Sequence, residues 1–262
     1  MVHLVHKTFI IILTSVLFFH AALFPSKEQI ELLTPIVIKK HPKEPAFTQG
    51  LAIRGSYLYE STGLYGQSKI RVLDLTTNQI IVQYDLPPNY FGEGIAIKGE
   101  HLYQLTWNEN IALIYKLEPL RFSHHLPFKW QGWGLCTDGD SLLATNGTSE
   151  LHWLNPTTFT LVKKRVVKFN GKPIQRLNDL ECVGKALYIN IWLSDYILRV
   201  DKESGKVTGV IDASQLLTEQ EKSQLPQEAV LNGIVYRSIS DTFFITGKYW
   251  PYLFEVRFQP AS

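Results

Sequence analysis

Residues 91–97 read Phe-Gly-Glu-Gly-Ile-Ala-Ile, and the quartet that begins at Glu93 has counterparts along the whole chain. The counterparts are Gln49-Gly-Leu-Ala, Trp133-Gly-Leu-Cys, Asn178-Asp-Leu-Glu and Asn232-Gly-Ile-Val. Their first members are 44, 40, 45 and 54 residues apart. The chain therefore contains an internal repeat of five units.

Each unit predicts a set of short β-strands. A turn such as Lys98-Gly-Glu follows the quartet, and short runs rich in Val, Ile, Tyr and Phe come next. Four short strands in each 40 to 45 residues are typical of a β-propeller, so we predict an all-β, five-bladed β-propeller over residues 31–262. The last unit supplies three strands, over 231–237, 242–248 and 252–258. We expect residues 35–41 to add the fourth and close the ring, which would leave no exposed sheet edge there.

The long interval between the last two quartets indicates an insertion over residues 212–229. Within it, residues 214–222 predict a short helix. The favoured interpretation is surface decoration. The alternative is that the insertion forms a rim above the central cavity.

Composition favours one large domain without a nucleic-acid partner. The chain has 262 residues, 45% of them hydrophobic, and a formal net charge of +2. This length and hydrophobicity allow a sizeable core, and no linker-like segment divides the body. Because the basic residues are scattered, no phosphate-binding surface is predicted.

The N-terminus predicts export. Lys7 precedes an apolar run over residues 8–24, the length of a signal peptide or a short membrane anchor. We therefore assign residues 1–30 to a signal peptide, with a retained anchor as the alternative, and expect a periplasmic or secreted protein that contacts the membrane only through such an anchor. The body contains two cysteines, Cys136 and Cys182; we expect two buried thiols, and one disulfide is the alternative.

The propeller fold predicts where polar residues meet. The first strand of each blade lines the central channel, so the first residues of the five quartets should form a ring around the axis. These residues are Gln49, Glu93, Trp133, Asn178 and Asn232. The ends of the second strands should bring Trp107, Trp192 and Lys248 to the same mouth. This mixture suits a small-molecule site, although polar side chains in such a channel also serve simply to bind ordered water.

Glu93 is the candidate acid or base. Nearby indoles should reduce its hydration and raise its pKa, and a carboxyl group that titrates closer to neutrality can pass protons in both directions. The alternative is an ion pair between Glu93 and Lys248, which would hold the acid charged.

Seven ordered motifs resemble the plant- and bacterial-type glutaminyl cyclases. They are Phe47-Thr-Gln-Gly-Leu, Phe91-Gly-Glu-Gly-Ile, Leu105-Thr-Trp, Gly132-Trp-Gly-Leu, Leu177-Asn-Asp-Leu-Glu, Asn190-Ile-Trp and Thr246-Gly-Lys-Tyr-Trp-Pro. The resemblance spans residues 40–258. It implies a five-bladed propeller that converts N-terminal glutamine to pyroglutamate and releases ammonia.

The resemblance also implies roles for individual residues. Glu93 corresponds to the proton-shuttling glutamate, and the three indoles of Trp107, Trp133 and Trp192 correspond to the pocket walls. The polar substrate contacts of the family correspond to Gln49, Asn178 and Lys248, with Phe47 beside them. The family commonly has Asn-Glu-Leu-Glu where this chain has Asn178-Asp-Leu-Glu. We expect Lys248 or Asn178 to stabilise the oxyanion, with Gln49 and Asn232 among the substrate contacts.

The expected partners are peptides or proteins with an N-terminal glutamine, bound by a monomer. No metal or other cofactor is expected in catalysis, although a structural calcium ion on the axis is compatible with it. Two other functions fit the same residues: a calcium-dependent, lactonase-like hydrolase with Glu93, Asn178 and Asn232 as oxygen ligands, and a propeller that binds peptides without catalysis.

Overall fold

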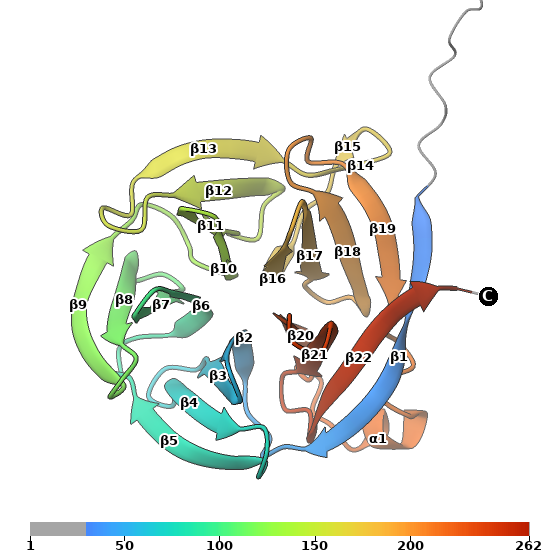
Figure 1. Cartoon of the computed structure of the whole chain (residues 1–262), viewed down its shortest axis with the longest axis horizontal. Coiled ribbons are helices and arrows are strands. Elements are labelled where there is room, and N and C mark those ends of the chain that lie inside the picture. Colours follow the sequence, from blue (N-terminus) through green and yellow to red (C-terminus); the bar gives the residue numbers. More distant parts are fainter. Residues whose placement is uncertain (1–29, 262) are drawn as a thin grey trace, which may run out of the picture.

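The structure is a computed structural model that describes residues 30–261. The predicted signal peptide or anchor, including the apolar run 8–24, lies outside these residues. The described part is a propeller-like all-β fold in which sheets surround a central axis (Figure 1). Within it, no helix is long and apolar enough to cross a membrane.

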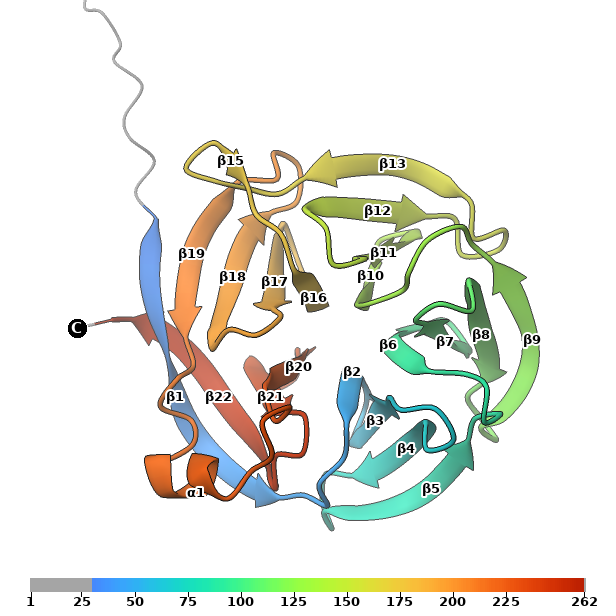
Figure 2. The ribbon, with the colours of Figure 1, turned by 180° about the vertical axis from the view of Figure 1, so that it is seen from behind.

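Three sheets have four strands each, and in each the strands follow sequence order from the axis outward (Figures 1 and 2). The first comprises β2 (Thr48–Arg54), β3 (Tyr57–Thr62), β4 (Lys69–Asp74) and β5 (Gln79–Asp85). The second comprises β6 (Gly92–Lys98), β7 (His101–Thr106), β8 (Ile111–Lys116) and β9 (Arg121–Pro127). The third comprises β10 (Leu135–Asp138), β11 (Ser141–Ala144), β12 (Glu150–Leu154) and β13 (Leu161–Val166).

The remaining long strands form one eight-stranded sheet in the order β16-β17-β18-β19-β1-β22-β21-β20. Its members are β16 (Leu177–Val183), β17 (Ala186–Ile191), β18 (Tyr196–Asp201), β19 (Val207–Asp212), β1 (Glu31–Pro42), β20 (Leu231–Arg237), β21 (Thr242–Gly247) and β22 (Tyr252–Pro260). A small hairpin of β14 (Lys168–Phe169) and β15 (Lys172–Pro173) stands apart.

The strand β1 connects the two ends of the chain. Its residues from Leu33 to Pro42 pair antiparallel with β22, with Leu33 opposite Pro260 and Pro42 opposite Tyr252. Its first residues, from Glu31 to Leu33, pair parallel with β19. The segment 35–41 thus occupies the position next to β22 that the sequence analysis assigned to it.

The insertion contains a shorter helix than predicted. The helix α1 spans Glu219–Ser223 and begins after Thr218, whose side chain accepts a hydrogen bond from the Glu221 backbone while the Glu221 carboxylate accepts one from the Thr218 backbone. This capping box fixes the start of the helix at Thr218. Residues 214–217 precede this cap and are not helical, and Leu216 and Leu217 among them are buried in the core.

The five inner strands make a closed ring of contacts, in the order β2, β6, β10, β16, β20 and back to β2. Glycine makes this packing close: a Cβ on Gly94 would lie 2.5 Å from the Trp133 carbonyl oxygen, and one on Gly134 would lie 2.3 Å from that of Asn178. The glycine after Glu93 therefore allows neighbouring inner strands to approach closely.

The expectation of two free thiols was wrong. Cys136 on β10 and Cys182 on β16 form a disulfide, with their Cα atoms 5.8 Å apart. The two cysteines lie on adjacent inner strands, so the ring brings together residues that are 46 positions apart in the sequence. Cysteine spacing alone could not reveal this proximity.

Candidate active site

A cavity of about 360 Å³ opens at one end of the axis. Eight of the nine predicted site residues line it: Phe47, Gln49, Glu93, Trp107, Trp133, Asn178, Trp192 and Lys248. These residues come from every unit of the repeat, so the site depends on the whole ring. The volume is in the range of pockets that hold small ligands.

Three of the polar residues lie at irregular positions in the inner strands. Strand pairing shifts register around Gln49 in β2, around Glu93 in β6 and around Asn178 in β16. A local bulge of this kind can re-aim a side chain out of the regular alternation. This accounts for polar side chains that point into the cavity from strands that are otherwise buried and apolar.

The ends of the second strands supply the next group of side chains. Trp107 follows β7, Trp192 follows β17 and Lys248 follows β21. Backbone hydrogen bonds hold all three positions: the Trp107 N–H donates to the Phe91 carbonyl at 3.1 Å, the Trp192 N–H to the Arg176 carbonyl at 2.9 Å, and the Lys248 N–H to the Val230 carbonyl at 2.9 Å. The predicted convergence of these three residues is therefore present.

Aromatic rings form most of the cavity wall. The indoles of Trp133 and Trp192 meet edge to face with centroids 5.5 Å apart, and Phe91 contacts Trp107 at 5.4 Å. Phe47 meets Phe91 edge to face at 6.1 Å. Such interlocked rings keep their positions and offer an apolar surface to the aliphatic part of a ligand.

Glu93 is a buried acid held by one neighbour. The Gln49 Nε2 donates a hydrogen bond to the Glu93 Oε1 at 3.0 Å. Burial raises the pKa of Glu93 well above its usual range; Lys248 opposes this shift, and Asp179 and Glu109 add to it. Glu93 makes no ion pair with Lys248 within 4.0 Å, which argues against the alternative in which that pair keeps the acid charged.

Lys248 is a buried amine facing the same cavity. Burial lowers its pKa to about 8, although the negative charge of Glu93 acts in the opposite direction. The Lys248 Nζ lies over the ring of Phe47, 4.3 Å from its centroid, where the face of the ring favours the charged form. Lys248 can therefore carry a proton near neutrality and lose it in mildly alkaline solution.

Several polar groups on the wall have no partner within residues 30–261. The Gln49 Oε1 and the Trp133 Nε1 are buried and make no hydrogen bond there. The Asn178 carboxamide makes none either, although its backbone carbonyl accepts one from Thr145. Because unpaired buried polar groups are costly, these atoms are suited to bond with a ligand.

Asn232, the ninth predicted residue, does not line the cavity. It is fully buried in β20, and its Nδ2 donates to the Thr48 carbonyl at 3.1 Å. The side chain therefore ties β20 to β2. The repeat predicted the level of Asn232 in the ring. It could not show that the carboxamide of Asn232 is hydrogen-bonded to the backbone of the neighbouring strand β2.

Five further residues line the cavity: Phe91, Leu193, Gln227, Glu228 and Val230. Phe91 had a sequence signal, since it precedes Glu93 by two positions as Phe47 precedes Gln49. Gln227 and Glu228 come from the insertion, so its end does form part of a rim, as the alternative interpretation held. The helix α1 itself contributes no lining residue.

The described residues contain no cluster of side chains typical of a metal site. Among residues 30–261, no three or more His, Cys, Asp or Glu side chains are arranged to hold a metal ion. Asn232, one of the residues suggested for a lactonase-like calcium site, does not line the cavity; its Nδ2 donates to the Thr48 carbonyl, and its Oδ1 is buried without a hydrogen bond among the described residues.

Comparison with known proteins identifies the family. The family model described as glutamine cyclotransferase matches residues 10–258. A glutaminyl-peptide cyclotransferase of Arabidopsis thaliana is 39% identical over 232 residues, covering 86% of this chain and 72% of the plant protein. The crystal structure of Myxococcus xanthus glutaminyl cyclase superposes with a TM-score of 0.83 at 38% identity, covering 89% of this chain and 100% of the bacterial one. The chain belongs to the glutamine cyclotransferase family.

Proposed function

We propose that this protein is a glutaminyl-peptide cyclotransferase, which converts the N-terminal glutamine of peptides and proteins to pyroglutamate and releases ammonia. The observation that carries the proposal is the buried Glu93 carboxyl group, which lies in an aromatic cavity and, among residues 30–261, accepts a side-chain hydrogen bond only from Gln49. The similarity to a plant glutaminyl-peptide cyclotransferase and to a bacterial glutaminyl cyclase supports it over most of the chain.

The reaction needs folding of the substrate and management of one proton. The α-amine nitrogen attacks the carbon of the γ-carboxamide, and a C–N bond forms. Glu93 accepts the proton that the amine loses, then delivers it to the departing nitrogen as the original C–N bond breaks and ammonia leaves. A carboxyl group with a raised pKa suits both transfers.

The other polar groups orient the reactants. Gln49 holds Glu93 through its Nε2 and presents its unpaired Oε1 to an N–H group of the substrate. Lys248 or Asn178 stabilises the negative oxygen of the tetrahedral intermediate, a contribution that is large where water is excluded. The aromatic walls hold the glutamine side chain folded back on its amine, so that positioning supplies part of the acceleration.

Further features belong to the same proposal. The strand order, with four strands from β16 to β19 and four more from β20 through β22 to β1, supports a five-bladed β-propeller closed by the N-terminal strand. Residues 31–262 would form this catalytic domain and residues 1–30 an export signal or anchor. The protein would act as an exported monomer and require no metal.

Ammonia release from a glutaminyl dipeptide tests the proposal. Mass spectrometry should show loss of one ammonia per peptide, and a chelator should leave the rate unchanged. A peptide whose α-amine is acetylated is the matched control, because it keeps the carboxamide but removes the nucleophile. Absence of ammonia from the free peptide, or equal release from the acetylated one, would contradict the proposal.

A further inference from the structure

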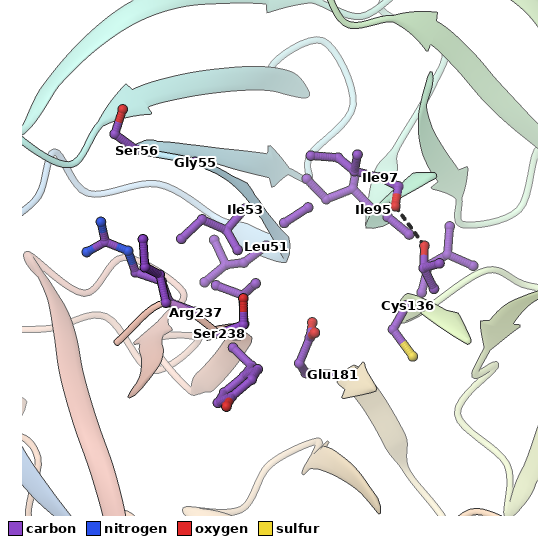
Figure 3. A pocket seen from close by; sticks show the side chains of 17 residues that line it. Leu51, Ile53, Gly55, Ser56, Ile95, Ile97, Cys136, Glu181, Arg237 and Ser238 are labelled. Carbon is purple, nitrogen blue, oxygen red and sulfur yellow. Dashed lines mark hydrogen bonds between the residues drawn. The ribbon is translucent and has the colours of Figure 1, made fainter. Parts of the chain in front are cut away.

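The opposite end of the axis contains a second cavity, of about 540 Å³. It is lined by the later residues of the inner strands β2, β6, β10, β16 and β20 (Figure 3), which in β2, β6 and β16 follow the active-site residues. Its wall combines apolar side chains, Leu51, Ile53, Ile95 and Ile97 among them, with polar groups. None of its lining residues lines the active-site cavity.

One carboxylate projects into this apolar space. Figure 3 shows the Glu181 side chain directed into the cavity from β16. The corresponding residues of the other four quartets are Ala52, Ala96, Cys136 and Val235. Glu181 is thus the one carboxylate among the five equivalent residues at this level of the ring.

Glu181 has no partner among residues 30–261. It makes no hydrogen bond or ion pair there. Arg237 lines the same cavity, but its guanidinium group is directed away from the Glu181 carboxylate (Figure 3). Burial raises the pKa of Glu181 well above its usual range, and nearby Asp179 adds to the shift. An acid held in this environment gains stability from a cation that enters the cavity.

The chemistry of the wall limits the kind of cation. A calcium ion needs six to eight oxygen ligands, and a guanidinium has five N–H donors to satisfy. The cavity offers one carboxylate and hydrocarbon around it, with hydroxyl groups at Ser56, Thr137, Tyr236 and Ser238. A primary ammonium has three donors, and an apolar chain attached to it would pack against the wall.

We propose that this cavity binds a primary ammonium group carried on an apolar chain, with Glu181 as its counter-ion. A free alkylamine and a lysine side chain presented by another protein share this chemistry. The proposal concerns a site separate from the active-site cavity and does not depend on the cyclisation reaction.

Calorimetric titration with n-butylammonium tests the site, with n-butanol as the uncharged analogue. We expect saturable binding of one ammonium per chain and at least tenfold weaker binding of the alcohol, since a charge-assisted bond is lost. Glu181→Gln should also weaken ammonium binding at least tenfold. Asp140→Asn, an exposed carboxylate in a turn after β10, is the control and should bind as wild type does.

Two further measurements keep the test independent of how Glu181→Gln folds. Ser238 is exposed, so Ser238→Trp should block the cavity and abolish binding without disturbing the core. In the wild type, binding should strengthen as the pH rises through the raised pKa of Glu181 and weaken as the amine loses its proton near pH 10. The charged and ionisable groups in or beside this cavity are Asp179 from β16 and Arg237 and Tyr236 from β20.

N-acetyl-lysine methylamide distinguishes the sources. Binding comparable to that of butylammonium would indicate that a lysine of a partner protein fits, and binding of the free amine alone would indicate a small amine. The proposal is overturned if the wild type shows no saturable binding, if butanol binds equally, or if Glu181→Gln and Ser238→Trp both bind as wild type does.

Discussion

Replacing Glu93 with glutamine separates proton transfer from substrate binding. Glutamine has nearly the same shape as glutamate, and its carbonyl oxygen can still accept the 3.0 Å hydrogen bond from the Gln49 Nε2. The aromatic walls of the cavity are untouched. The substitution therefore removes the proton acceptor and leaves the rest of the site in place.

The expected loss of rate follows from the role of the acid. General acid–base catalysis contributes a factor of about 10² to 10⁴, so Glu93→Gln should lower kcat by at least ~10²-fold, or about 2.7 kcal/mol of transition-state stabilisation. Substrate affinity should change by less than about tenfold, or about 1.4 kcal/mol. Ammonia release from a glutaminyl dipeptide measures the rate, and calorimetry on the inactive variant measures the affinity.

Stability provides an internal check on this variant. Because the folded-state pKa of Glu93 is raised, the folded protein binds this proton more tightly than the unfolded chain does. Stability is therefore lost as the pH rises from the unfolded value of 4.5 toward the folded one. Glutamine cannot ionise, so Glu93→Gln should unfold at the same or a higher temperature at neutral pH.

The control is Glu118→Gln, the same chemical change at an exposed position whose side chain makes no hydrogen bond or ion pair among residues 30–261. It should retain wild-type activity. Retention of a tenth of the rate by Glu93→Gln would refute the role assigned to the acid. A loss of affinity greater than tenfold would show instead that Glu93 mainly binds substrate.

Three further predictions concern charge, covalent linkage and packing. Since the pKa of Lys248 is about 8, its stabilising charge is present below that pH and is lost above it. The wild-type pH profile of kcat/KM divided by that of Lys248→Arg, whose charge persists, should therefore fall above pH 8. A flat ratio would contradict the role of this charge. The double substitution of Cys136 and Cys182 by alanine should lower the free energy of unfolding in urea by about 2 to 4 kcal/mol, because the disulfide closes a loop between residues 46 positions apart. An unchanged urea midpoint would argue against the bond. Gly94→Ala should cost about 1 to 3 kcal/mol, because its Cβ would lie 2.6 Å from the Gly134 Cα, and wild-type thermal stability would disprove this close packing.

The sequence predicts the site better than its individual contacts. A period of 40 to 45 residues is enough to place Gln49, Glu93 and Asn178 at one level of a ring, because equivalent positions of a radial repeat meet at its axis. It cannot say which of these side chains face the cavity. Asn232 occupies the equivalent position, yet its carboxamide bonds to the Thr48 backbone.

Features outside the repeat were harder to predict. Gln227 and Glu228 reach the cavity from the insertion, which has no counterpart in the other units. The disulfide joins inner strands of consecutive repeat units, and the repeat does not show that the two cysteines on them lie within bonding distance. In each case a long-range contact, rather than local sequence preference, decides the outcome.

The pairing of β1 with β22 has a consequence for biosynthesis. The first described strand emerges from the ribosome long before its partner, which lies at the opposite end of the chain. Until synthesis and any translocation are finished, the edge of β22 is absent and β1 must remain unpaired on that side. Unpaired strand edges promote association between chains, and contacts of such high sequence separation form slowly. A nascent chain of this protein should therefore depend on holding factors, such as chaperones, until its last residues are released.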